Sequence, residues 1–277
     1  MTSKIFKAAR TAVITGAASC IGFAAARYCL SQKMNVVLAD LRGEALARAH
    51  ASLSDEAGDQ ATASVLAVDC DVSKADEVEA LKTTALNAFG DIALVMNNAV
   101  TRDGGGIFEP IDGWYRSMEV NYWGVVHGVR TFAPLMMEQE APSAMVNCGS
   151  KQGITNPPGN SSYNITKAAV KFLTESLQHE LRGAERCPLS AHLLIPGWTT
   201  SGGREHKPGA WLPDQVVAEM VKGVDAGDFY ILCPDNEVSL EMDGKRIRWA
   251  AGDITENRPP LSRWHEGYKV AFELFER

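Results

Sequence analysis

Short apolar runs alternate with longer helix-like segments from residue 11 to residue 232. The apolar runs occupy residues 11–15, 35–40, 64–68, 92–96, 143–147, 189–195 and 229–232. The helix-like segments between them occupy residues 22–32, 41–53, 74–89, 111–138, 161–184 and 213–225. Parallel strands need a crossover connection, which is usually a helix. The rhythm therefore predicts a doubly wound α/β fold, with a seven-stranded, mostly parallel sheet and helices on both faces.

Length and charge narrow the function classes. The chain has 277 residues, enough to bury one large core. Its formal net charge is −7 at pH 7, which disfavours nucleic acid or an anionic membrane as a partner. We find neither an apolar run of spanning length nor a signal-peptide pattern, and we therefore expect a cytoplasmic protein.

The six cysteines are scattered and include no CxxC pair. This usage is typical of reduced thiols in a reducing compartment, and it indicates neither a disulfide framework nor a metal site. Beyond residue 232 the composition becomes charged and contains prolines. We expect a domain at 1–232 and a C-terminal extension at 233–277, packed on this domain or on a neighbouring subunit. In it, Tyr268, Phe272 and Phe275 would share one helical face, reached through an extended strap at RPPLS.

The segment TGAASCIG, from Thr15 to Gly22, follows the first apolar run. Gly16 at the strand end and Gly22 in the next helix would place backbone N–H groups against a pyrophosphate, as in a Rossmann-type dinucleotide fold. Asp40 ends the second run, where an acid binds ribose hydroxyls and repels a 2′-phosphate. We therefore expect NAD rather than NADP, although Arg42 keeps NADP open as the alternative.

Tyr163 and Lys167 are four residues apart in a predicted helix, so both side chains share one face. Ser150 lies thirteen residues before Tyr163, and Asn121 lies in MEVNYWGV. In this order they resemble the short-chain dehydrogenase/reductase family, and the resemblance covers roughly residues 8 to 232. Further matching segments are TGxxx(C)IG at 15–22, Asp40, Asp71 in CDVS, NNA at 97–99 and PGWTTS at 196–201.

The resemblance implies a secondary alcohol or ketone substrate and hydride transfer with NAD, with NADP less favoured. Tyr163 would exchange a proton with the substrate oxygen, Ser150 would hydrogen-bond that oxygen, and Lys167 would stabilise the phenolate and hold the nicotinamide ribose. A phenol is too weak a base near neutral pH without such a neighbouring charge. Asn121 would hold a water that connects Lys167 to solvent. The family also predicts a homodimer or homotetramer.

The family pattern also implies the residues that contact the cofactor. These are Gly16, Ser19, Cys20, Ile21, Gly22, Asp40, Asp71, Asn98, Ala99, Tyr163, Lys167, Pro196, Gly197, Thr199 and Ser201.

Two positions depart from the family. Cys20 replaces the middle glycine of the turn, and Val100 replaces the glycine that ends NNAG. A negative φ at Cys20 would cost little, whereas a positive φ would cost on the order of 1 kcal/mol. A redox-sensitive thiol at the helix N-terminus is the functional alternative. The same two residues are the only hints of a non-catalytic dinucleotide sensor.

The sequence gives less information about the substrate. Apolar and polar side chains that follow the catalytic strand and the PG motif are expected to form the pocket. These are Gln152, Ile154, Trp198 and Trp211.

Overall fold

The computed structural model describes residues 3–58, 63–200 and 205–275. Within these ranges, seven strands form one sheet in the order β3-β2-β1-β4-β5-β6-β7, and every pair of neighbours is parallel. The strands are β1 (Thr11–Thr15), β2 (Asn35–Asp40), β3 (Val65–Asp69), β4 (Leu94–Asn97), β5 (Ser143–Cys148), β6 (Leu189–Ile195) and β7 (Tyr230–Leu232). The predicted seven-stranded α/β sheet is confirmed.

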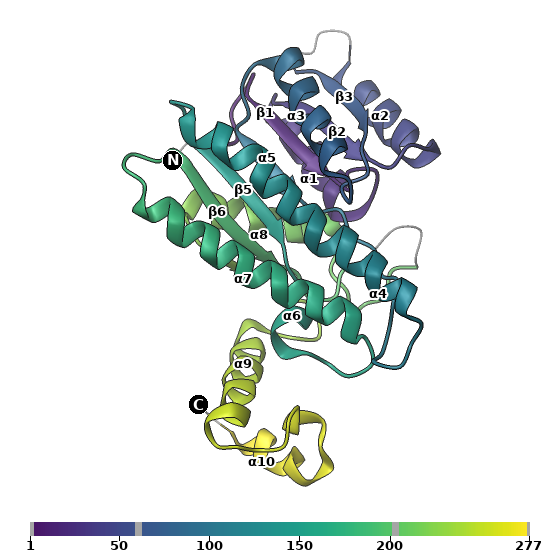
Figure 1. The fold of residues 1–277 in the computed structure, drawn as a ribbon, viewed down its shortest axis with the longest axis vertical. Coiled ribbons are helices and arrows are strands. Elements are labelled where there is room, and N and C mark those ends of the chain that lie inside the picture. The colour runs from purple at the N-terminus through teal and green to yellow at the C-terminus, as the bar shows by residue number, and fades with distance from the viewer. Residues whose placement is uncertain (1–2, 59–62, 201–204, 276–277) are drawn as a thin grey trace.

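Helices cover both faces of the sheet (Figure 1). Those on one face are α1 (Cys20–Ser31), α2 (Glu44–Ala57) and α8 (Pro213–Ala226). Those on the other face are α3 (Ala75–Phe89), α5 (Gly124–Glu138) and α7 (Ser161–Gly183). Two shorter helices, α4 (Ile111–Met118) and α6 (Gln152–Thr155), lie in the connections. In the described ranges, no helix is both long and apolar enough to cross a membrane.

Successive side chains along each strand point to opposite faces of the sheet, so the protein has two separate cores. In β1, Ala12 and Ile14 belong to the core under α1 and α8, whereas Val13 belongs to the core under α3 and α5. Each strand is therefore apolar on both faces, which explains the continuous apolar runs in the sequence.

The sequence places most boundaries within two residues of the observed ones. The fourth strand begins at Leu94 rather than at residue 92, because the backbone N–H and C=O of Ile92 bond the side-chain amide of Gln139. The helical stretch expected at 111–138 is interrupted by a π-helical turn at Glu119–Trp123. Such turns are rare and occur frequently at functional sites.

The strand order reverses between β1 and β4, which are neighbours in the sheet although β2 and β3 lie between them in the sequence. In doubly wound sheets, a ligand binds in the crevice outside the carboxyl ends of the strands at this point. The loops that follow β1, β4, β5 and β6 therefore build the candidate site.

The C-terminal segment, residues 233–275, extends away from the sheet beyond α6 (Figure 1). It contains α9 (Leu240–Thr255), two 3-10 turns (Ser262–Trp264 and Glu266–Tyr268) and α10 (Lys269–Leu274). The buried Trp249 organises it, with its ring centroid 5.4 Å from that of Phe272 and 5.2 Å from that of Phe275. Trp249 also donates a hydrogen bond of 2.8 Å to Ser262 Oγ. This segment therefore has a small aromatic core of its own.

Candidate active site

A cavity of about 770 Å³ opens at the carboxyl edge of the sheet. Sixteen of the residues expected at the site line it: Gly16, Ser19, Cys20, Ile21, Asp40, Asp71, Asn98, Ala99, Ser150, Gln152, Tyr163, Lys167, Pro196, Gly197, Trp198 and Thr199. One continuous cavity thus joins the glycine turn after β1 to the N-terminal turns of α7.

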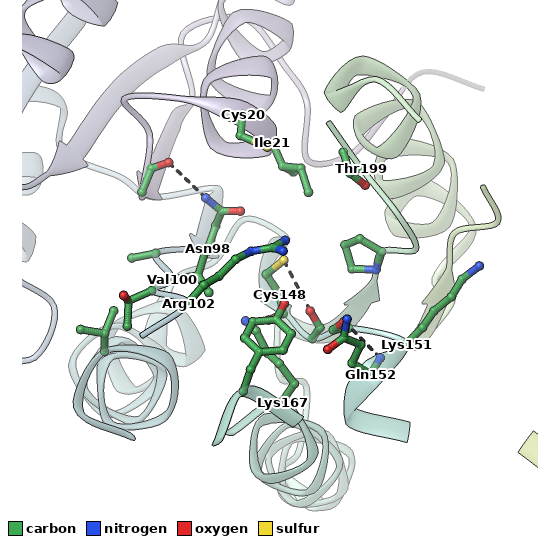
Figure 2. A pocket seen from close by; sticks show the side chains of 18 of the residues that line it. Cys20, Ile21, Asn98, Val100, Arg102, Cys148, Lys151, Gln152, Lys167 and Thr199 are labelled. Atoms are coloured by element: carbon green, nitrogen blue, oxygen red, sulfur yellow. Dashed lines mark hydrogen bonds between the residues drawn. The ribbon is translucent and has the colours of Figure 1, made fainter. Parts of the chain in front are cut away.

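Tyr163 and Lys167 lie one turn apart near the start of α7, and both are buried, with exposed fractions of 8% and 2%. Lys167 Nζ donates a hydrogen bond of 2.7 Å to the carbonyl oxygen of Cys148 and lies 5.8 Å from the Tyr163 ring centroid. The Arg102 guanidinium carbon lies 5.7 Å from the same centroid. Figure 2 shows Arg102, Cys148 and Lys167 converging from three elements. Two positive charges therefore flank the phenol.

Ser150 follows β5 and lines the cavity beside this pair. Its hydroxyl oxygen accepts a hydrogen bond of 3.2 Å from the backbone N–H of Gln152. Because the acceptor side of the hydroxyl is used, its hydrogen is available to a substrate oxygen.

Asn121 lies in the π-helical turn, fully buried behind the cavity wall. Its Oδ1 accepts a hydrogen bond of 2.7 Å from Thr101 N, and its Nδ2 donates to Thr101 O (2.9 Å) and Thr166 Oγ1 (3.3 Å). The side chain therefore fixes the backbone of the cavity-lining Thr101 against α7. Its expected role in holding a water stays a prediction.

The glycine turn has the geometry that a pyrophosphate requires. Gly16 adopts a φ of 65°, and a Cβ there would come within 2.8 Å of Ala99 Cα. Asn98 Nδ2 donates to the carbonyl oxygens of Thr15 (3.0 Å) and Gly16 (3.2 Å), which joins the turn to the end of β4. In the described chain, no side chain caps the N-terminus of α1. Its first N–H groups can therefore bind an anion, and the residues fit a dinucleotide.

Cys20 adopts a φ of 54°, in the left-handed region that favours glycine. The backbone thus keeps the conformation of the family's glycine although a side chain is present. Cys20 Sγ lies 3.4 Å from the carbonyl oxygen of Thr200, across the cavity edge. The backbone at Cys20 is therefore strained, at a cost of about 1 kcal/mol.

Replacing Cys20 by glycine should raise the free energy of unfolding by about 0.5–1 kcal/mol, because glycine adopts this φ without strain. The smaller residue should also strengthen NADH binding. Urea unfolding and a fluorescence titration with NADH measure the two effects. Cys187→Gly, at a partly buried cysteine away from the cavity, is the matched control. A Cys20→Gly variant less stable than the parent would show that side-chain contacts outweigh the strain.

Asp40 lies at the carboxyl end of β2 and lines the cavity. Its carboxylate accepts hydrogen bonds of 2.8 Å from the backbone N–H groups of Ala18 and Leu41. The Arg42 side chain is 89% exposed and pairs with Asp69 at 3.5 Å, outside the cavity wall. The charge that faces the cavity here is therefore negative.

Some expected residues do not line the cavity. Ile154 packs against the core under α5, and Trp211 packs against the core under α8, so neither lines the cavity, and their expected contact with a substrate stays a prediction. Their aromatic and aliphatic surfaces are used for packing, which the sequence pattern could not separate from ligand contact. Gly22 also lies off the wall, where a Cβ would collide with the carbonyl oxygen of Gly16. Ser201 lies outside the described residues.

Comparison with known proteins agrees with this geometry. Residues 10–207 match the family model of the short chain dehydrogenases. The chain belongs to this family. The match includes the glycine turn, Asn121, Ser150, Tyr163 and Lys167.

Several short chain dehydrogenases resemble this chain in sequence and structure. A 1-deoxy-11-beta-hydroxypentalenate dehydrogenase of Streptomyces avermitilis is 34% identical over 190 residues, 68% of this chain and 67% of the relative. A 3beta-hydroxysteroid dehydrogenase 2 of Eggerthella lenta is 34% identical over 175 residues, 61% of this chain and 64% of the relative. A short chain dehydrogenase/reductase of Burkholderia phymatum, solved in complex with NAD, has a TM-score of 0.82 and 32% identity, and the alignment covers 92% of this chain and 97% of that one.

Several residues that line the cavity of this short chain dehydrogenase were not expected from the sequence. Arg102 follows the NNAV segment, and Lys151 lies next to Ser150, so their places in known motifs could have marked them. Arg246 and Arg263 come from the C-terminal segment, which the family match does not include. We know of no sequence signal that would have brought these two arginines to the site.

Proposed function

We propose that this short chain dehydrogenase interconverts a secondary alcohol and a ketone with NAD(H), with Tyr163 as the general acid and base. The observation that carries the proposal is the buried pair of Tyr163 and Lys167, which opens on the same cavity as the glycine turn. An arrangement of this kind serves proton exchange at one end and dinucleotide binding at the other. The intact pair argues against a non-catalytic sensor.

Each side chain has a defined task in this proposal. Ser150 donates a hydrogen bond to the substrate oxygen and holds it beside Tyr163. Tyr163 gives its phenolic proton to that oxygen in reduction and takes it back in oxidation. The Lys167 ammonium, fixed by Cys148 O, stabilises the phenolate left behind. A bound nicotinamide supplies or accepts the hydride at the substrate carbon.

The names of the relatives support an alcohol group as the reacting centre, since two of them are named as dehydrogenases of a hydroxypentalenate and of a hydroxysteroid. The proposed substrate is therefore a small molecule, and we expect the enzyme to act as a homodimer or homotetramer. Progress curves at 340 nm, with NAD or NADP and a panel of secondary alcohols and ketones, test the activity. Turnover with NAD is the expected result. Absence of turnover on every member of a broad panel, despite tight NADH binding, would favour the sensor.

The preference for NAD rests on Asp40, whose carboxylate faces the cavity while Arg42 is paired outside it. Replacing Asp40 by alanine should weaken NADH binding about tenfold, because a charge-assisted hydrogen bond is worth about 1.5–3 kcal/mol. NADPH binding should strengthen, because the repulsion of a 2′-phosphate is lost. Asp40→Asn keeps an acceptor for Ala18 N, and Asp55→Ala, on the exposed face of α2, reproduces the charge change elsewhere. Unchanged NADH and NADPH affinities in Asp40→Ala would contradict the assignment.

A further inference from the structure

The C-terminal segment contributes two arginines to the wall of the catalytic cavity. Arg246 lies on α9 and Arg263 on the 3-10 turn at Ser262–Trp264, and both line the cavity that holds Tyr163. A smaller hollow next to it, lined by Thr155, is bordered by the same two arginines. The pair therefore lies beside α6, which follows Ser150, and on the side of the cavity that serves the substrate in the proposed function.

The positive charge of this pair is incompletely compensated within the described chain. The neighbouring carboxylates are already paired, since Asp235 and Asp243 lie 3.3 and 2.6 Å from Lys151 Nζ. Asp253 lies 3.1 Å from Arg258 Nε. Asp243 attracts both cavity arginines, but it shares its charge with Lys151.

Two buried nitrogens of the pair lack hydrogen-bond acceptors in the described structure. They are Arg246 Nε and Arg263 Nη1. Burial, together with the like charge of Arg246, lowers the pKa of Arg263 to about 10. Buried donors without acceptors are costly, and the cost is removed when an acceptor arrives.

The scaffold holds Arg263 in place before any ligand binds. Its guanidinium carbon lies 4.0 Å from the ring centroid of Trp264 and 5.9 Å from that of Phe272. Stacking of this kind orients the planar guanidinium while leaving its edge free for a bidentate acceptor. Lys151 ties α9 to the end of β5 and thereby fixes Arg246 relative to Ser150.

We propose that Arg246 and Arg263 bind a carboxylate of the substrate, so that this enzyme acts on hydroxy acids or keto acids whose carboxylate is remote from the reacting carbon. The inference rests on the proposed function for the reacting group, and on the C-terminal arginines for the anion. A carboxylate matches two guanidinium groups in charge and in acceptor geometry.

Paired substrates test the proposal. Levulinate, 6-oxoheptanoate and 4-acetylbenzoate are each compared with their methyl esters in NADH-dependent reduction. The wild-type protein should show a kcat/KM at least tenfold higher for one or more of the acids than for the matching ester. Arg246→Gln and Arg263→Gln should each remove most of this ratio, chiefly through KM. Arg248→Gln, on the exposed face of the same helix, should leave the ratio unchanged.

Further measurements distinguish a failure of the carboxylate site from a failure of the dehydrogenase proposal. Arg263→Lys keeps the charge and should recover part of the preference, and circular dichroism checks that each variant is folded. Acid and ester reduced equally well by wild type, or a preference that survives both Gln variants, would overturn the carboxylate site and leave the dehydrogenase proposal standing. Loss of NADH affinity in the Gln variants would also overturn it, because the pair would then bind the cofactor.

Calorimetric titration with 4-acetylbenzoate decides the case in which no ketone is reduced. Binding by wild type that weakens at least tenfold in either Gln variant would support the anion site even though the dehydrogenase proposal had failed. Binding of equal strength in all three proteins would reject it.

Discussion

The Tyr163→Phe variant should lose turnover by a factor of about 10³, within the range of about 10²–10⁴ that positioned acid–base groups contribute. In the proposed mechanism, no other side chain that lines the cavity in the described structure would supply this proton with matching geometry, because Ser150 would hold the substrate oxygen and Lys167 Nζ is bonded to Cys148 O. NADH affinity should change by less than about twofold, since the ring stays in place between Arg102 and Lys167. Steady-state kcat and a fluorescence titration with NADH measure the two effects.

The control for this variant is Tyr115→Phe, at an exposed tyrosine on α4, which should retain full activity. In the described structure, the Tyr163 hydroxyl makes no hydrogen bond to another residue, so its removal should not disturb the fold. Thermal unfolding within about 1 °C of the parent would verify this point. Activity within tenfold of wild type would remove Tyr163 from the mechanism.

The sheet could be predicted from the sequence because its five inner strands are buried on both faces, and the two edge strands, β3 and β7, are still apolar. Val13 and Ile14 are neighbours in the chain and reach opposite cores, so the run stays apolar and its length marks the strand. The start of β4 lies at Leu94 rather than at residue 92 for a local reason. Ile92 is as apolar as a strand residue, but a side-chain amide, that of Gln139, satisfies its backbone.

The geometry of the proposed catalytic pair could be predicted because its spacing alone determines how the two side chains lie on a helix. Tyr163 and Lys167 share a face wherever α7 lies, and the strand that ends before Ser150 brings that face to the sheet edge. The conformation of Cys20 could not be predicted in this way. Its φ of 54° is imposed by the turn that joins β1 to α1, against the preference of the residue itself.

The positions of Arg246 and Arg263 in the cavity could not be predicted from local sequence patterns. Arg246 is separated from Tyr163 by more than eighty residues, and its position depends on how α9 docks against α6. That docking is supported by the ion pairs of Lys151 with Asp235 and Asp243, which have no sequence signature. Tertiary packing therefore decides the substrate side of the cavity.

The Lys151→Met variant should lose about 3 kcal/mol of unfolding free energy at pH 8, as expected when one partner of a buried ion pair is removed. The side chains of Lys151, Asp235 and Asp243 are only 13%, 5% and 4% exposed, so water cannot replace the ammonium. Asp235 keeps the backbone N–H groups of Trp198, Glu237 and Val238 as donors. Asp243 is therefore the carboxylate that would lose its direct ion-pair partner, with only the longer-range attraction of Arg246 and Arg263 remaining.

The loss should depend on pH in a definite direction. Burial raises the pKa of Asp243 above its ordinary value even with Lys151 present, and removing the ammonium raises that pKa further. A folded-state pKa above the unfolded one gives stability that is present at low pH and lost as pH rises through the folded value. The difference between Lys151→Met and the parent should therefore shrink between pH 8 and pH 5, as measured by urea unfolding.

Lys222→Met is the control that distinguishes the loss of the buried ion pair from a general loss of positive charge. Lys222 is 75% exposed and lies 3.4 Å from Glu219, so its removal should change the unfolding free energy by no more than about 0.5 kcal/mol at either pH. A loss below about 1 kcal/mol in Lys151→Met, or one that does not depend on pH, would mean that Asp243 is not held by Lys151. The docking of α9, and with it the position of Arg246 in the cavity, would then depend on the packing of α9 against α6 rather than on this ion pair.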